Sequence, residues 1–124
     1  MRQESVQYFT DKEEEFANLL TTIGMKKNVA QVLVFLANTP EANSREIERG
    51  TDMRQPEVSL AMKYLLDQGW IKSHANTSKN KGRPTKVYKL AKTIAVIMDS
   101  IEREKKTEAK NKLALIKKLQ NYLP

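Results

Sequence analysis

The spacing of two short amphipathic segments in the middle of the chain constrains its fold more than any other feature. Residues 43–50 (NSREIERG) carry one apolar anchor, Ile47, and end in glycine. Three residues, TDM, separate them from residues 54–69 (RQPEVSLAMKYLLDQG), which have a proline near their start. Proline suits the first turn of a helix because its missing N–H is not needed there. The pattern predicts a short helix, a tight turn and a second helix, which make a helix-turn-helix.

Both segments also carry helix-end signals. Asn43 or Ser44 is expected to cap the first helix and Gly50 to end it, while Gly69 is expected to end the second. Apolar residues in the second helix recur at helical spacing, so one face is expected to be buried: Val58, Met62, Leu65 and Leu66.

Two further helices are predicted ahead of this unit. Thr10 and Glu13 have the spacing of a capping box, and Gly24 is expected to end the helix that they start. The next helix runs through residues 26–38 (KKNVAQVLVFLAN), and Pro40 prevents its simple continuation.

A β-hairpin is predicted after the helix-turn-helix. Residues 70–75 (WIKSHA) and 85–90 (TKVYKL) alternate apolar and polar residues, as half-buried strands do. Trp70 is expected to anchor the core beneath the hairpin, with Tyr88 packed against it. The predicted fold is therefore mostly α with a small β-hairpin wing, a winged helix-turn-helix. A small α+β fold with another role stays open as the alternative.

A long helix is predicted at the end of the chain, because residues 92–123 contain no glycine or proline. Its apolar residues gather at both ends, and a small domain cannot bury both groups. We expect a homodimer interface that the first helix joins, formed by Phe16, Leu20, Leu113, Ile116, Leu119 and Leu123. A helix that folds back in a monomer is the alternative. The expected domains are an N-terminal helix (1–24), a winged helix (25–91) and a long C-terminal dimerisation helix (92–124).

The excess positive charge lies in one segment. The net charge is +7, and seven of the 22 basic residues lie between Gln68 and Met98, where there is no Asp or Glu. Clustered charge of this sign is the electrostatic footprint of a polyanion such as nucleic acid. A merely solvated basic loop is the other interpretation.

Residues 27–90 resemble the winged helix-turn-helix of prokaryotic, particularly archaeal, transcription regulators of the MarR and TrmB-like groups. The resemblance rests on two stretches, SREIERGTDMRQPEVSLAMKYLLDQGWI and the later KGRPTKVYKL. The resemblance implies a homodimer that binds double-stranded DNA at a palindromic operator, and it leaves room for a small-molecule effector. The recognition helix departs from these families, because Pro56, Leu60 and Ala61 stand where Ser, Thr and Arg are frequent.

The recognition helix is expected at residues 54–68, in the major groove of DNA. The residues expected to contact DNA are Arg54, Gln55, Glu57, Ser59, Leu60 and Lys63. Gln55 can read adenine, Arg54 guanine and Glu57 cytosine, although Glu57 can instead complement the helix N-terminus. Leu60 either meets a thymine methyl group or packs in the core, and Lys63 meets a phosphate. Ser44 and Thr51 are further phosphate candidates, or simply caps.

The basic wing is expected at residues 76–89, on the minor groove or the phosphate backbone. Its expected contacts are Lys79, Lys81, Gly82, Arg83 and Lys86. The lysines can neutralise phosphates, Gly82 permits close approach of the backbone, and Arg83 can enter a narrow minor groove. A Gly-Arg-Pro sequence that only turns the hairpin is the alternative.

Several classes of function find no support in the sequence. There is no cysteine, one histidine and no glycine-rich phosphate loop, so we expect neither an enzyme nor a metal or other cofactor. No apolar run is long enough for a membrane helix and no signal peptide is evident, so a cytoplasmic location is expected. A winged-helix protein-interaction module and a non-specific architectural nucleic-acid-binding protein stay open as alternative functions.

Overall fold

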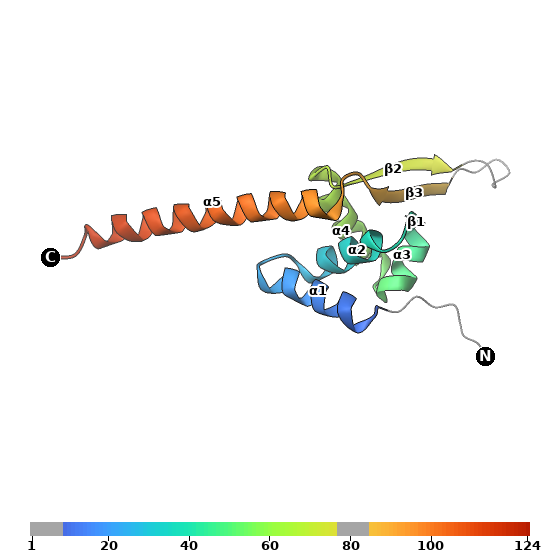
Figure 1. Cartoon of the computed structure of the whole chain (residues 1–124), viewed down its shortest axis with the longest axis horizontal. Coiled ribbons are helices and arrows are strands. Elements are labelled where there is room, and N and C mark those ends of the chain that lie inside the picture. The colour runs from blue at the N-terminus through green and yellow to red at the C-terminus, as the bar shows by residue number, and fades with distance from the viewer. Residues whose placement is uncertain (1–8, 77–84) are drawn as a thin grey trace. The chain divides into compact units, whose positions relative to one another are not determined.

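The computed structural model describes residues 9–76 and 85–124, which form five helices and three short strands (Figure 1). The elements are α1 (Asp11–Thr22), α2 (Lys27–Ala37), β1 (Ala42–Asn43), α3 (Ser44–Thr51), α4 (Gln55–Asp67), β2 (Ile71–Asn76), β3 (Thr85–Leu90) and α5 (Ile94–Gln120). The predicted fold class, mostly α with a small β wing, is confirmed. The chain divides into two compact units, Met1–Lys92 and Thr93–Pro124. A separate domain for residues 1–24 stays a prediction.

Helix α1 begins and ends as the sequence predicts. The Thr10 hydroxyl accepts a hydrogen bond from the Glu13 N–H, and the Glu13 carboxylate accepts one from the Thr10 N–H, which completes the capping box. At the other end Gly24 has a positive φ of 114°. The Met25 N–H then donates to the Leu20 carbonyl, which is the hydrogen bond of a Schellman motif.

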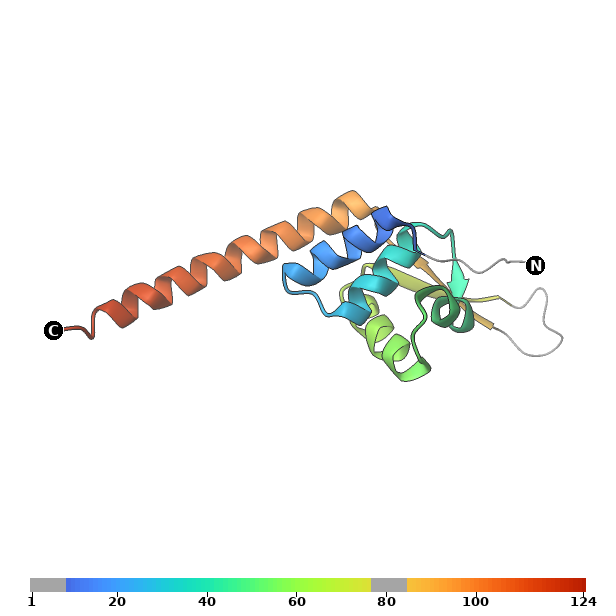
Figure 2. The ribbon, with the colours of Figure 1, turned by 90° about the horizontal axis from the view of Figure 1, so that it is seen from below.

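Helix α2 is the centre of the first unit. It packs against α1, α3, α4 and β3 (Figure 2). Its sequence, KNVAQVLVFLA, is apolar on nearly every side, as expected of a helix surrounded by protein. Val29, Ala30 and every residue from Val32 to Leu36 are buried.

Helix α3 is capped as predicted but ends one residue later. The Asn43 side chain accepts a hydrogen bond from the Glu46 N–H at 2.8 Å, so Asn43, not Ser44, is the cap. The expected end at Gly50 is wrong: the helix continues to Thr51, and Asp52 adopts the left-handed conformation. Gly50 is instead a packing residue, because a Cβ there would lie 2.8 Å from Cδ1 of Phe35.

Helix α4 buries Val58, Met62 and Leu65, as predicted, together with Ala61. Leu66 was expected inside but is exposed, because it lies at the edge of the buried stripe. Gly69 has a φ of 76° and ends the helix, and the Trp70 N–H donates to the Leu65 carbonyl in a second Schellman motif.

Trp70 is buried, as predicted, and it has an aromatic partner, Tyr64, that was not predicted. The packing of Tyr88 against Trp70 stays a prediction. The Trp70 and Tyr64 rings meet edge to face, with centroids 6.2 Å apart. The hydrophobic contact that commonly accompanies a Schellman motif explains this pairing, since Tyr64 and Trp70 flank the end of the same helix.

The two strands of the predicted hairpin pair with each other and with a third strand that was not predicted. The sheet order is β1-β3-β2, and all neighbours are antiparallel. Ala42 and Asn43 of β1 lie opposite Tyr88 and Val87 of β3. The expected alternation of buried and exposed residues is wrong: Val87 and Tyr88 are both buried in the central strand, whereas β2 buries only Ile71.

Helix α5 contains 27 residues and is capped by Thr93, whose side chain accepts a hydrogen bond from the Val96 N–H. It ends at Gln120, so Leu123 lies beyond the helix. Ile97 and Ile101 are buried. Every residue from Lys106 onward is exposed, including the large apolar residues Leu113, Leu115, Ile116 and Leu119.

Candidate DNA-binding interface

The outward face of α4 is the first part of the candidate interface. Burial of Val58, Ala61 and Leu65 on one side directs the opposite side to solvent. All six residues predicted to contact DNA from this helix are exposed: Arg54, Gln55, Glu57, Ser59, Leu60 and Lys63. Exposure makes them available to a partner, while their role in binding DNA stays a prediction.

The polar side chains on this face are paired along the helix. Nε2 of Gln55 donates to Oγ of Ser59 at 2.7 Å, one helical turn away. Nζ of Lys63 lies 3.3 Å from Oδ2 of Asp67, and both side chains are largely exposed. The sequence prediction omitted Asp67, although its i, i+4 spacing from Lys63 is a recognisable signal. A phosphate contact by Lys63 would compete with this weak ion pair.

Glu57 has a structural role at the start of α4. Its carboxylate accepts a hydrogen bond from the Arg54 N–H at 3.1 Å, as expected of an acidic residue in the first turn. Its backbone carbonyl accepts a bond of 3.0 Å from Nδ2 of Asn28 in α2. No sequence signal relates Asn28 to Glu57, because the two residues are 29 positions apart.

Leu60 lies on the surface rather than in the core. Its side chain is 65% exposed, which excludes the core-packing interpretation. Together with Tyr64, Val29 and Met25 it lines a pocket of about 310 Å³ beside the loop between α1 and α2. An exposed apolar side chain on the outer face of α4 is compatible with contact to a thymine methyl group.

One side of α4 faces a shallow groove of about 400 Å³. The groove brings Ser44, at the start of α3, together with Gln55, Ser59 and Lys63 of α4. Thr51, the other predicted phosphate candidate, is buried, and its hydroxyl donates to the Ile47 carbonyl. Because this hydroxyl is occupied inside the fold, Thr51 is a structural residue.

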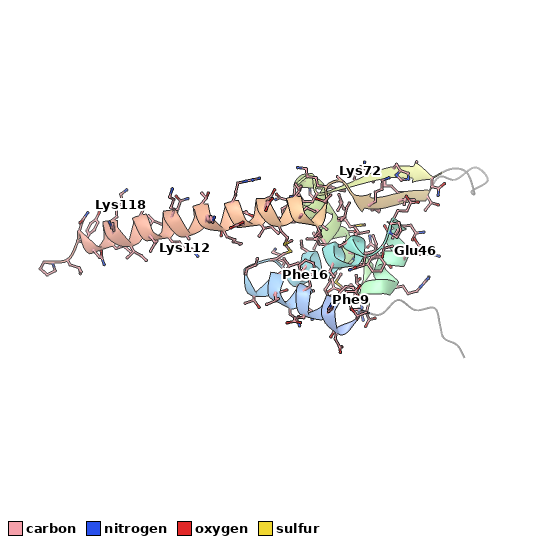
Figure 3. The ribbon with its side chains drawn as sticks, in the orientation of Figure 1. Phe9, Phe16, Glu46, Lys72, Lys112 and Lys118 are labelled. Atoms are coloured by element: carbon pink, nitrogen blue, oxygen red, sulfur yellow. The ribbon has the colours of Figure 1, made fainter. Side chains whose placement is uncertain are left out.

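The wing supplies the second part of the candidate interface. Lys79, Lys81, Gly82 and Arg83 lie outside the described residues, so their contacts with DNA stay predictions. Within the strands, Lys86 is exposed on β3 opposite Ala75. Lys72 projects from β2 and lies opposite Lys89 (Figure 3). These lysines place positive charge along the base of the wing.

The residues expected at a dimer interface fall into two groups. Leu113, Ile116, Leu119 and Leu123 are exposed and available to a second chain. Phe16 is half-buried, whereas Leu20 is only 3% exposed. Leu20 therefore belongs to the core of the protomer. Leu19 of α1 and its C-cap residue Ile23 are exposed instead. The helical pattern of α1 did not show which of its apolar residues would meet α2.

Other kinds of site have little support in the described part of the chain. Nε2 of His74 lies 3.7 Å from Oε1 of Glu41, which gives the histidine a surface partner that the sequence did not suggest. Residues 9–76 and 85–124 contain no cluster of three metal-ligating side chains. None of the helices in these ranges is long and apolar enough to span a membrane.

Comparison with known proteins agrees with this geometry. Residues 23–79 match the model of the MarR family. A possible transcriptional regulator from Methanosarcina mazei Go1 has a TM-score of 0.63 at 14% identity, over 86% of each chain. A MarR family regulator from Neisseria meningitidis has a TM-score of 0.51 at 20% identity, over 87% of this chain and 80% of that one.

A MarR family transcriptional regulator from Silicibacter pomeroyi has a TM-score of 0.53 at 14% identity, over 90% of this chain and 82% of that one. At these identities the solved structures show a shared fold. None of the curated proteins is a recognisable relative by sequence. The family match over residues 23–79 and the shared fold together show that this chain contains a winged helix-turn-helix similar to that of MarR family proteins.

Proposed function

We propose that this protein is a transcriptional regulator that binds a specific double-stranded DNA sequence as a homodimer. The observation that carries the proposal is the outward face of α4, which presents Arg54, Ser59 and Lys63 to solvent from a helix-turn-helix. A helix of this kind fits the major groove, where each base pair offers a distinct pattern of donors and acceptors.

The basic wing would contribute affinity rather than sequence recognition. Lysines that contact phosphates bind without reading bases. Lys86 is exposed on β3, and in this proposal Lys79 and Lys81 are further phosphate contacts. In this proposal Arg83 enters the minor groove, where narrow A/T tracts concentrate negative potential.

The homodimer would form through the C-terminal part of the chain, with α1 contributing. The end of α5 exposes Leu113, Ile116 and Leu119, a set of apolar residues that water solvates poorly. Two-fold symmetry would place the two recognition helices about one DNA turn apart, roughly 34–36 Å.

Selection from a randomised duplex DNA library at near-physiological salt tests the proposal. Enrichment of an inverted repeat, with half-sites about one helical turn apart, is the expected result. Absence of any DNA binding would overturn the proposal and direct attention to a protein partner.

A non-specific architectural role is the second candidate, and one observation favours it. The polar groups of α4 are paired among themselves, Gln55 with Ser59 and Lys63 with Asp67, which leaves fewer free groups to read bases. Tight binding without sequence enrichment in the same selection would support this candidate.

A further inference from the structure

Two side chains at the start of the recognition helix are joined to each other. Nε2 of Gln55 donates a hydrogen bond of 2.7 Å to Oγ of Ser59, one helical turn further along α4. Both side chains are exposed, and Gln55 is the first residue of the helix. In a helix-turn-helix the N-terminal residues of the recognition helix are the ones that reach the base edges. In the function proposed above, the pair therefore lies where bases are read.

The backbone that carries Gln55 is held by the rest of the fold. Nδ2 of Asn28 in α2 donates a bond of 3.0 Å to the Glu57 carbonyl, in the first turn of α4. The Glu57 carboxylate accepts a bond of 3.1 Å from the N–H of Arg54, the residue just before Gln55. The first turn of α4 is thus fixed both to α2 and to its own N-cap.

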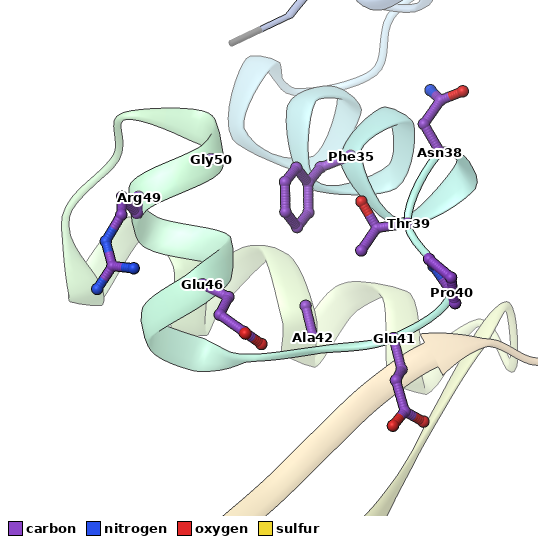
Figure 4. Close-up of a pocket in the computed structure, with 9 residues that line it drawn as sticks. All are labelled: Phe35, Asn38, Thr39, Pro40, Glu41, Ala42, Glu46, Arg49 and Gly50. Carbon is purple, nitrogen blue, oxygen red and sulfur yellow. The ribbon is translucent and has the colours of Figure 1, made fainter. Parts of the chain in front are cut away.

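The other helix of the helix-turn-helix is also anchored. The Phe35 ring of α2 lies so close to Gly50 of α3 that a Cβ at position 50 would overlap it (Figure 4). Asn43 and Glu46 close the start of α3 with two reciprocal bonds of 2.8 Å. With both helices anchored, the orientation of the Gln55 amide depends on its own side-chain torsions.

The bond to Ser59 restricts these torsions without using all of the amide. A glutamine amide has a carbonyl oxygen that accepts and two N–H groups that donate. Ser59 takes one N–H, which leaves Oε1 and the second N–H to meet a ligand. A donor next to an acceptor is the pattern that pairs with N7 and N6 of adenine in the major groove. Guanine offers two acceptors at that edge, so the amide matches it at only one position.

Ser59 is better placed to orient Gln55 than to act as an acceptor for a base. Its oxygen already accepts the bond from the amide. A free glutamine side chain loses its rotational freedom when it binds, which weakens binding by about threefold to tenfold. Because Ser59 restricts Gln55 before DNA arrives, less freedom is lost on binding.

We propose that Ser59 is a positioning residue, which holds the Gln55 amide in the orientation that reads adenine, and that the DNA site of α4 contains an adenine contacted by Gln55. The contact between the two side chains exists in the free protein and is independent of the function proposed above, whereas the reading of adenine rests on that function. Ser59 thus affects sequence preference through Gln55.

An isosteric pair of variants at position 59 tests the positioning step in the full chain without DNA. Threonine keeps the hydroxyl and valine replaces it with a methyl group, so Ser59→Thr and Ser59→Val differ in one hydrogen-bonding group. NMR relaxation of the Gln55 side-chain amide should show an ordered group in the wild type and in Ser59→Thr, and a mobile one in Ser59→Val. Equal mobility in all three proteins would overturn the proposal.

Selection from the randomised duplex library, run in parallel with each protein, tests the reading step. Gln55→Ala locates the adenine, as the position whose base preference disappears. There Ser59→Thr should keep a preference for adenine of about tenfold, as one bidentate contact gives, and Ser59→Val should reduce it to below about threefold. Lys63→Gln, one turn further along α4, is the comparison and should weaken all sequences alike, since phosphate contacts carry no sequence information.

The outcomes separate this inference from the proposed function. If no base preference depends on Gln55, or if Ser59→Val keeps the preference in full, the inference is overturned while specific DNA binding stands. If the wild-type chain binds no duplex, the proposed function fails and the reading of adenine fails with it. An ordered Gln55 amide that loosens only in Ser59→Val would still establish the positioning contact.

Discussion

Nδ2 of Asn28 donates a hydrogen bond of 3.0 Å to the backbone carbonyl of Glu57, which ties the start of α2 to the first turn of the recognition helix. Oδ1 of the same side chain accepts a bond from the Val29 N–H, so the amide is held from both ends. The carboxylate of Glu57 in turn caps the Arg54 N–H. Asn28 thereby fixes the position of the helix end that is proposed to enter the major groove.

Replacing Asn28 should weaken DNA binding through misplacement of α4. Asn28→Ala removes both side-chain hydrogen bonds, one exposed and one partly buried. We expect a loss of about 1 kcal/mol in unfolding free energy and about fivefold in DNA affinity. Urea unfolding and fluorescence anisotropy with labelled operator measure the two effects. Asn18→Ala, on the exposed face of α1, is the control and should change neither.

Removing the cap of α3 should destabilise the helix-turn-helix. Asn43→Ala deletes the acceptor for the Glu46 N–H and should lower the free energy of unfolding by about 1 kcal/mol. Asn43→Asp keeps an acceptor at the same place and should retain most of the stability. Equal losses in the two variants, measured by urea unfolding, would contradict the capping role.

Adding a methyl group at position 50 should disturb the contact between α2 and α3. A Cβ on Gly50 overlaps the Phe35 ring, so Gly50→Ala should cost about 1–3 kcal/mol despite the better helix propensity of alanine. Phe35→Leu removes the overlap with a Cβ at position 50, but the smaller side chain leaves a cavity that lowers stability by itself. The double variant should lose less unfolding free energy than the sum of the losses in the two single variants, and a double-mutant cycle measures this difference.

Neutralising the wing should reduce the salt dependence of DNA binding. Lys79→Gln, Lys81→Gln and Lys86→Gln together should lower the slope of log K against log salt by about three, since each phosphate contact contributes about one. Lys106→Gln, in an i, i+4 ion pair on α5, is the matched control. A slope that stays the same in the triple variant would refute the role of the wing.

Charges in the apolar end of α5 should prevent dimer formation. Ile116→Glu with Leu119→Glu places two carboxylates among exposed apolar residues, so we expect a monomer in sedimentation velocity and much weaker operator binding. Lys117→Glu with Lys118→Glu is the control, which places two carboxylates at neighbouring exposed positions, with Lys118 on the side of the helix away from Ile116. If the apolar-face variant stays dimeric, the interface lies elsewhere.

Local sequence patterns were enough to predict the features that depend on neighbours within a few residues. The capping box of Thr10 and Glu13 and the left-handed glycines 24 and 69 were predicted, because helix ends are satisfied by groups one turn away. The buried stripe of α4 was largely predictable for the same reason, since Val58, Met62 and Leu65 recur at helical spacing. These local signals also gave the order of the elements and hence the winged helix-turn-helix.

Tertiary structure decided the features that join distant segments. Strand β1 exists because β3 offers it a pairing edge, and two residues carry no recognisable strand pattern of their own. Gly50 looks like a helix end in the sequence, but the Phe35 ring gives it a packing role that only contact between two helices creates. In α1, Leu20 is buried and Leu19 is exposed because the face of the helix that carries Leu20 packs against α2. Each outcome depends on contacts between residues far apart in the chain, which periodicity and capping signals do not specify.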